Sequence, residues 1–427
     1  MPFQTVENNH SRSESLYKSR WLAPELSQAA KDHPVVILTG ARQAGKSTVL
    51  KQEKPFSHWQ KIDLDDLSIL EQAERDPASL LTGGKDTFII DEVQRAPTLL
   101  YTVKQAVEKA RHEIRFVLTG SADLLLMRQV SETLEGRAAY FSLPPMGLGE
   151  MESRLPPKWF FQLFHGNMPP LKDIKVVAVE NTPDLMLRGF MPPLLYLKSP
   201  ESWLKWWESY IATYIERDLR QVSQIESLTD FRRVMATLAV CSGYVLNQTE
   251  VARESGVSQP TVYRYINVLE ISCLLERLPA FCASCSRRLA KSPKIFWLDP
   301  GLSAFLMGYH DAESISSARE LDGLFKTLVF LHLKILGQLF TPHLRFYHWR
   351  TVTGKQVDFV IKWGRKIVAM EINFTTEPRY EDCANLRLFL EEYPDTLFCL
   401  LVHNGSTVRM LQEKILAIPW NALAFDL

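Results

Sequence analysis

The chain has 427 residues, with 49 Lys and Arg against 49 Asp and Glu, so its formal net charge at pH 7 is zero. This balance excludes a protein that binds nucleic acid through an overall positive charge, so any such contact must come from a local patch. Apolar residues make up 46% of the chain, which suffices for full cores, and the length predicts about two to four domains.

Neither the N-terminus nor any later segment indicates export or membrane insertion. No apolar run reaches the length of a membrane span, and residues 1–20 are polar and charged, unlike a secretory signal. Cys282 and Cys285 form a single C-x-x-C among six scattered cysteines. Without a second pair or a nearby histidine, this spacing indicates buried thiols rather than a zinc or redox site. We therefore expect a cytoplasmic protein with no membrane partner.

The most informative motif follows an apolar run at 35–38 that predicts a buried strand. It reads G-x-x-x-x-G-K-S and leads into a segment that can begin a helix, the context of a phosphate-binding loop rather than of a chance glycine turn. Its backbone N–H groups and the helix N-terminus would hold a polyphosphate. Lys46 is expected to reach the β- and γ-phosphates, and Ser47 to hold Mg²⁺. The predicted nucleotide-binding residues are Gly40, Ala41, Arg42, Gln43, Ala44, Gly45, Lys46, Ser47 and Thr48.

Polar residues end two later predicted strands. The apolar segment 87–90 runs into Asp91, which is expected to hold Mg²⁺ directly or through water, and Glu92, which would polarise an attacking water. The next strand ends in Thr119 and Ser121, either of which would sense the γ-phosphate or orient the water. Ordinary turn chemistry explains Ser121 equally well.

A single arginine is a candidate for catalysis between subunits. Arg137 stands late in the helix expected after the third strand, before another apolar strand at 139–143. An arginine finger often lies at such a place, and it would then serve a neighbouring subunit of a homo-oligomer. The alternative is a solubilising arginine at a helix end.

The predicted elements divide the chain into parts. Strands and helices alternate as a parallel sheet requires, so residues 1–150 are expected to form an α/β P-loop NTPase core with a lead-in helix at 16–30. Residues 151–226 are expected to be a variable connection and a helical lid, with a long helix at 203–225 whose aromatic residues form a packing stripe.

Residues 227–317 predict a winged helix-turn-helix. Asn247 and Ser258 are N-cap residues, and the helix at 259–271 exposes side chains that can meet phosphates and base edges. The following stretch, 277–294, is basic with no carboxylate, which suits a DNA backbone. The alternative is a lid used for protein contacts or interdomain packing. The predicted DNA contacts are Gln259, Thr261, Tyr263, Arg264, Arg287, Arg288 and Lys291.

In their order, these motifs resemble the prokaryotic AAA-type ATPases that carry a C-terminal domain of unknown function, relatives of the archaeal ATPase and STAND groups. The resemblance spans nearly the whole chain. It implies that the triphosphate is ATP, and that the turn at 189–192 lies near the adenine. The strings that carry it are 38–48, 90–94, 118–121, 135–137, 214–219, 291–296, 299–302 and 357–360.

The same resemblance implies a restriction-endonuclease-like α/β domain at 318–427. The residues predict a helix at 321–336, three strands, a second helix, a further strand and a last helix at 408–416. Asp358 and Glu371, on adjacent strands, would converge on a metal ion.

Three positions depart from a working nuclease. Lys326 stands where many relatives have a carboxylate, Gln356 replaces a glutamate, and Asn373 replaces a catalytic lysine. We therefore expect a degenerate site in which Lys326 pairs with the remaining acids.

Three functions follow as hypotheses. The first is a Mg²⁺-dependent ATPase that couples turnover to DNA binding or remodelling. The second is a STAND-like scaffold in which ATP sets the conformation seen by protein partners. The third is an ATP-regulated nuclease.

Overall fold

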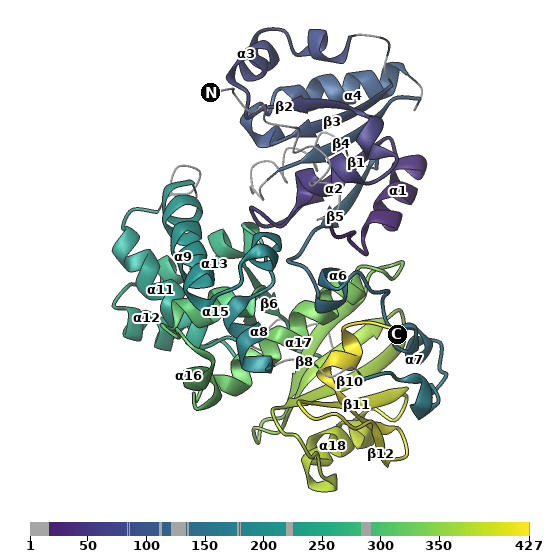
Figure 1. Cartoon of the computed structure of the whole chain (residues 1–427), viewed down its shortest axis with the longest axis vertical. Helices are drawn as coiled ribbons and strands as arrows, with labels where there is room; N and C mark the ends of the chain where they lie inside the picture. Colours follow the sequence, from purple (N-terminus) through teal and green to yellow (C-terminus); the bar gives the residue numbers. More distant parts are fainter. Residues whose placement is uncertain are drawn as a thin grey trace, which may run out of the picture.

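The computed structural model describes residues 17–82, 84, 86–110, 113–120, 134, 136–176, 179, 181–218, 225–282 and 292–426. An N-terminal sheet lies at one end of the molecule, and a helical part and a C-terminal sheet lie side by side at the other (Figure 1). Within the described ranges, no helix combines the length and apolar character needed to cross a bilayer.

The N-terminal sheet is five-stranded and parallel, with the order β2-β3-β4-β1-β5. This confirms the predicted α/β fold. Its strands are β1 (Val35–Thr39), β2 (Gln60–Asp63), β3 (Thr87–Asp91), β4 (Arg115–Thr119) and β5 (Ala138–Ser142). Its helices are α1 (Ala23–Asp32), α2 (Lys46–Gln52), α3 (Leu67–Arg75) and α4 (Leu99–Lys109).

Both faces of this sheet are covered, which explains why its central strands read as continuous apolar runs. Along β1, Val35 and Ile37 pack into one core, whereas Val36 and Leu38 pack into another on the opposite face. Because the strands are parallel, the C-terminal ends of β1, β3 and β4 share one edge of the sheet. The phosphate-binding loop and the carboxylates after β3 are therefore neighbours.

The middle of the chain is helical, and the single helix predicted at 203–225 is wrong in one respect. Helix α9 ends at Tyr210, and the backbone continues as a π-helical segment, η7, from Ile211 to Asp218. The aromatic spacing that predicted one helix is compatible with both forms. The other elements are α8 (Thr182–Arg188), α9 (Pro200–Tyr210), α11 (Leu228–Val240), α12 (Gln248–Ser255), α13 (Gln259–Ile271), β6 (Leu275–Leu278), β7 (Lys294–Trp297), α15 (Pro300–Leu306) and α16 (Ala312–Ser316).

Helices α12 and α13 begin at the predicted caps. The Asn247 side chain accepts from the Glu250 N–H at 3.3 Å, and the Ser258 hydroxyl accepts from the Thr261 N–H at 3.3 Å. Gly256, with φ of 67°, takes the left-handed conformation that ends α12. After α13, β6 and β7 pair as a two-stranded antiparallel sheet.

The C-terminal sheet has six strands in the order β12-β13-β11-β10-β9-β8, with parallel and antiparallel pairs. Helix α17 packs on one face, and α18 on the other. The elements are α17 (Leu321–Gly337), β8 (Arg345–Arg350), β9 (Gln356–Trp363), β10 (Lys366–Asn373), α18 (Ala384–Glu392), β11 (Phe398–His403), β12 (Arg409–Gln412) and β13 (Ile415–Pro419).

The helix predicted at 408–416 is wrong, because this segment forms the β12–β13 hairpin. Lys414 has a positive φ of 66°, which turns the chain between the two strands. Strand β13 then pairs parallel to β11, and all of its residues are buried. Pairing with a strand that is distant in the chain decided this structure, and local spacing did not reveal it.

The connection after β5 packs on the C-terminal sheet. Helices α6 (Leu148–Met151) and α7 (Lys158–Phe164) share a hydrophobic core with α17 and the C-terminal strands. The Trp159 indole donates to the Ala422 carbonyl at 3.0 Å. The chain thus contacts its own C-terminal domain directly after it leaves the N-terminal sheet.

Replacing Gly301 with alanine is expected to destabilise the protein by about 1–3 kcal/mol, because α15 touches the end of α8 at this point. A Cβ at Gly301 would lie 2.6 Å from the Gly189 Cα. Urea unfolding measures the change. Gly364→Asn is the control: nothing lies within 4 Å of its added Cβ, and asparagine tolerates its φ of 61°. Equal stability of G301A and the wild type would contradict the prediction.

Candidate nucleotide-binding site

The phosphate-binding loop links β1 to α2, and its backbone requires glycine at two positions. Gly40 has a φ of 149°, and a Cβ there would lie 2.4 Å from the Leu143 carbonyl oxygen. Gly45 has a φ of 96° and is the residue before the first turn of α2. The loop therefore takes a conformation that L side chains rarely adopt, directly at a helix N-terminus.

Lys46, the loop lysine, is buried and folds back over the loop. Its Nζ donates to the Gly40 carbonyl at 2.9 Å and to the Ala41 carbonyl at 3.1 Å. Burial lowers the pKa of Lys46, although Glu92 and Asp91 oppose this effect. An ammonium group in this position is available to anionic oxygens that replace the two carbonyls.

Asp91 ends β3 and is 4% exposed. Burial by itself would raise its pKa, but hydrogen bonds from Thr119 and Ser47, together with Lys61, hold the pKa below the usual value. The Lys61 Nζ lies 3.1 Å from the carboxylate. Lys61 was not predicted from the sequence, although its place on the strand next to β3 is a usable signal.

The donor set fits Mg²⁺. A carboxylate and a hydroxyl, from Asp91 and Ser47, interact at the edge of the sheet where the loop begins its helix. Such oxygen ligands are the kind that Mg²⁺ takes from proteins, with the rest supplied by phosphates and water. These two residues would hold the ion.

Glu92 directly follows this carboxylate and has a positive φ of 55°. The Gln94 side-chain amide donates to its Oε2. Glu92 is also within electrostatic reach of Lys46. The structure therefore places the predicted base within electrostatic reach of the loop lysine.

Residues of the helical part also pack on the phosphate-binding loop. Ala41 and Ala44 belong to the same buried core as Tyr210 and Tyr214. The Tyr210 hydroxyl donates to the Arg42 carbonyl at 3.2 Å, and the Arg42 guanidinium lies 5.8 Å from the Tyr214 ring centre. The predicted packing stripe thus also contacts the nucleotide loop, which spacing within one helix does not show.

The turn between α13 and β6 also reaches this site. Cys273 Sγ lies 4.0 Å from the Ser142 Oγ, and its thiol is within electrostatic reach of Lys46. Burial raises the pKa of the Cys273 thiol. The candidate site therefore lies between the N-terminal sheet and the helical part.

A small cavity of about 60 Å³ adjoins the loop on the side of α2. Its lining includes Arg20, Gly45, Thr48, Pro192 and Tyr196. Pro192 belongs to the turn that the family resemblance places near the adenine. A wider groove of about 340 Å³ follows α2 on another side, next to Ser47 and Lys61.

Arg137 lies away from this cluster. It directly precedes β5, whose first residue is in register with Val35 at the start of β1, so it stands at the opposite edge of the sheet from the loop. Its guanidinium pairs with Glu108 at 3.0 Å. The structure therefore does not bring Arg137 to the phosphate site of its own chain. Ser121 falls outside the described residues.

Of the predicted DNA-contacting residues, those on α13 are among the residues that the structure describes. Gln259 and Tyr263 are exposed on α13, and Thr261 is half-buried. Arg264 pairs with Glu226 at 3.2 Å and lies 5.5 Å from the Tyr265 ring centre. The remaining predicted contacts lie outside the described residues; they are Arg287, Arg288 and Lys291.

Asp358 and Glu371, the two predicted metal-binding acids of the C-terminal domain, have partners within the protein. Asp358 accepts from the Lys294 Nζ at 2.6 Å and lies 3.3 Å from the Lys326 Nζ. Its second oxygen accepts from the Ile372 N–H at 3.0 Å. Glu371 accepts from Asn385 at 2.7 Å, and burial raises its pKa to about 7.

Lys294 was not singled out from the sequence for this site. It belongs to β7, a strand outside the C-terminal domain, and its side chain is fully buried. Two ammonium groups thus surround Asp358, where a nuclease would place a divalent cation. Within the described part of the chain, no group of three His, Cys, Asp or Glu side chains is placed to hold a metal.

The sheet order, the glycine loop and the carboxylate after β3 define a P-loop nucleoside-triphosphatase domain. Residues 32–152 match the family profile described as an AAA domain, so the N-terminal part of the chain carries an AAA-type P-loop domain. Residues 179–313 and 321–423 match two further profiles, both described as domains of unknown function, DUF8612 and DUF4143.

The chain is also similar to whole proteins. It is 29% identical over 369 residues to the uncharacterized protein Mb2031c of Mycobacterium bovis and, equally, to Rv2008c of Mycobacterium tuberculosis, covering 85% of this chain and 75% of each relative. A Walker-type ATPase of Pyrococcus abyssi matches with 16% identity and a TM-score of 0.44, over 68% of this chain and 97% of that one. A STAND protein with a tetratricopeptide repeat sensor from Pyrococcus horikoshii matches with 10% identity and a TM-score of 0.21, over 76% and 48%.

Asp358→Asn is expected to lower the free energy of unfolding by about 3–5 kcal/mol, because it leaves the buried Lys294 without a counter-charge. Lys294→Met should cost less, since Asp358 retains Lys326 as a partner. Urea unfolding at neutral pH measures both changes. The exposed Arg253→Met is the control, with an expected change within about 0.5 kcal/mol. Equal losses of unfolding free energy in D358N and K294M would contradict the conclusion that Asp358 has two lysine partners and Lys294 has one acid.

Proposed function

We propose that this protein binds ATP with Mg²⁺ and hydrolyses it. The observation that carries the proposal is the juxtaposition of Lys46, Ser47, Asp91 and Glu92 at one edge of the parallel sheet. We propose ATP as the nucleotide because residues 32–152 match the AAA family profile.

Each side chain has a distinct part in the proposed reaction. The Lys46 ammonium would leave the loop carbonyls and bind β- and γ-phosphate oxygens. Ser47 and Asp91 would hold Mg²⁺, which when bound neutralises charge on the phosphates. Glu92 would orient the attacking water and accept its proton. Thr119 and Lys61 keep the Asp91 carboxylate oriented and ionised.

Turnover would change the helical part of the molecule. The Tyr210 hydroxyl and the Cys273 turn both border the nucleotide loop, and both belong to segments that pack around α13. Binding or release of phosphates at the loop would therefore be transmitted to the helical part through these contacts. This geometry supports an ATP-driven switch acting through the helix-turn-helix.

Lys46→Ala is expected to abolish ATP binding, and Glu92→Gln to retain binding while turnover falls by about 100-fold or more. Isothermal titration with Mg·ATP and a phosphate-release assay measure the two quantities. Lys109→Ala is the control, since this exposed lysine lies on α4, distant from the loop. Near-normal hydrolysis by both K46A and E92Q would refute the proposed function.

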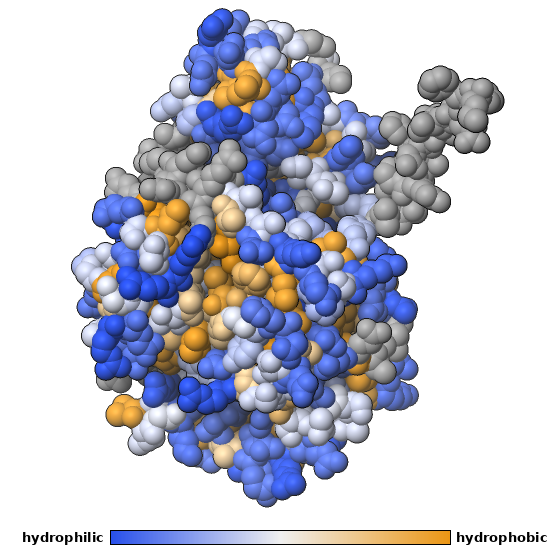
Figure 2. Space-filling model, turned by 60° about the vertical axis from the view of Figure 1, so that its left-hand side comes forward, coloured by the Kyte–Doolittle hydropathy of each residue, from blue (hydrophilic) through white to orange (hydrophobic). Residues whose placement is uncertain are grey.

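A second function, DNA binding by α13, is supported by its exposed face. Tyr263 is 51% exposed there, and Gln259 is also exposed. However, Arg264 and Arg277 on this side already pair with Glu226 and Glu270. A protein partner is the alternative. Figure 2 shows a hydrophobic area in the middle of one face of the molecule, and exposed areas of this kind suit protein contacts. We do not propose a nuclease, because Lys294 and Lys326 neutralise Asp358.

If α13 binds DNA, duplex DNA should stimulate ATP turnover, and the stimulation should fall steeply between about 50 and 200 mM salt. Tyr263→Ala should weaken DNA binding about tenfold. Tyr101→Ala, which removes a tyrosine that is 65% exposed from α4, should not. Turnover that is indifferent to DNA at both salt concentrations would favour the protein-partner alternative.

A further inference from the structure

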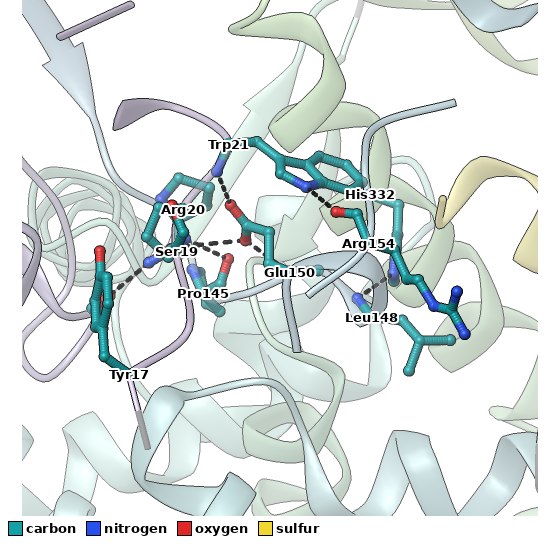
Figure 3. Close-up of polar contacts among 12 residues, drawn as sticks. Tyr17, Ser19, Arg20, Trp21, Pro145, Leu148, Glu150, Arg154 and His332 are labelled. Atoms are coloured by element: carbon teal, nitrogen blue, oxygen red, sulfur yellow. Dashed lines mark hydrogen bonds and ion pairs between the residues drawn. The ribbon is translucent and has the colours of Figure 1, made fainter. Parts of the chain in front are cut away.

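A buried arginine that precedes the N-terminal sheet holds the nucleotide loop by its backbone. Arg20 is 3% exposed, and its Nη1 donates to the Ala44 carbonyl at 2.8 Å. Its Nη2 donates to the Pro144 and Pro145 carbonyls at 2.7 and 3.2 Å. Its Nε lies 3.1 Å from the Glu150 carboxylate (Figure 3). One side chain thus joins the loop to the segment that follows β5.

Glu150 is held as firmly as the arginine. It is 1% exposed, and it accepts from the Trp21 N–H at 2.8 Å and from the Gly147 N–H at 3.0 Å (Figure 3). Two backbone donors and one guanidinium therefore balance its charge. A buried pair of this kind keeps its geometry, because either charge without the other would be costly.

The contact with Ala44 has a consequence for phosphate binding. Ala44 and Gly45 share one planar trans peptide, in which the carbonyl and the N–H point in opposite directions. By holding the Ala44 carbonyl, Arg20 also fixes the direction of the Gly45 N–H. That N–H is one of the backbone donors with which such a loop surrounds phosphates.

The short helix that carries Glu150 is docked on the C-terminal domain. The Leu148 N–H donates to the His332 Nε2 of α17 at 3.1 Å, while His332 Nδ1 bonds the Leu328 carbonyl at 2.9 Å. Burial lowers the pKa of His332 to about 4, so the ring is neutral and able to accept. A Cβ at Gly149 would lie 2.1 Å from the Ala424 carbonyl oxygen, which shows how closely α6 packs there.

We propose that Arg20 and Glu150 are positioning residues that set the conformation of the phosphate-binding loop. Because Glu150 lies on α6, the docking of α6 on the C-terminal domain controls nucleotide affinity through these two residues. The inference rests on the proposed ATP-binding function. Neither residue takes part in the chemical step, so the expected effect is on binding and not on the rate at saturation.

The test compares four variants by Mg·ATP titration and by steady-state turnover. Arg20→Ala and Glu150→Gln should each raise the Kd and the KM for ATP about tenfold or more, with kcat within about threefold of the wild type. Guanidinium at millimolar concentration should restore the affinity of R20A, which retains a space for it, but not that of Arg20→Met. The control is Arg154→Ala, an exposed arginine after α6. Circular dichroism melting checks that each variant is folded.

The outcomes are separable. Wild-type ATP affinity in folded R20A and E150Q would overturn the inference. A loss in R20A alone, with E150Q normal, would also overturn it, because Arg20 lines the small cavity and would then act by direct contact. The wild-type protein failing to bind Mg·ATP would instead refute the proposed function. If R20A does not fold, the Kd and KM of E150Q and Arg20→Lys for ATP test the inference in its place.

Discussion

The conformation of the phosphate-binding loop depends on side chains that hold its backbone carbonyls. Three side chains provide these hydrogen bonds: the loop's own lysine, an arginine that precedes the sheet and a tyrosine of the helical part. The pairs are Gly40 and Ala41 with Lys46, Ala44 with Arg20, and Arg42 with Tyr210. Because these carbonyls are bonded, the loop N–H groups have defined directions. Preorganised donors of this kind bind phosphate without first reordering the backbone.

The same contacts place the loop at the junction of all three parts of the molecule. Tyr210 connects it to the core around α13, and Arg20 connects it through Glu150 to the C-terminal domain. We therefore expect a change at the loop to alter both parts of the molecule through these contacts. This arrangement suits a switch better than an enzyme whose other domains are independent.

The acid pair of the C-terminal domain follows a different physical rule. Asp358 is buried, so its charge must be compensated, and Lys294 and Lys326 supply the compensation. Since Lys294 comes from β7, the neutralised acid joins the β6–β7 strand pair to the C-terminal sheet. Glu371 accepts a hydrogen bond from Asn385 at 2.7 Å, and burial raises its pKa to about 7. The site thus stabilises a domain contact.

Local sequence determined the elements whose signals are complete within a few residues. The glycine loop, the strand ending in Asp91 and the capped helices α12 and α13 were all predicted, since loop conformation, burial and capping act over short distances. Spacing favoured a helix at 408–416 and missed β13, because strand pairing joins residues far apart in the chain.

Only the tertiary structure showed which side chains meet. No sequence pattern predicted the partners of Arg20, Lys61 and Lys294. In the structure these side chains contact the Ala44 carbonyl, Asp91 and Asp358, respectively. Conversely, Arg137 stands in a suggestive place in the sequence but lies at the far edge of the sheet. A residue's type and its neighbours in the chain determine what it can do chemically. Its partner is decided by packing, because burial brings distant charges and carbonyls together and requires them to be paired.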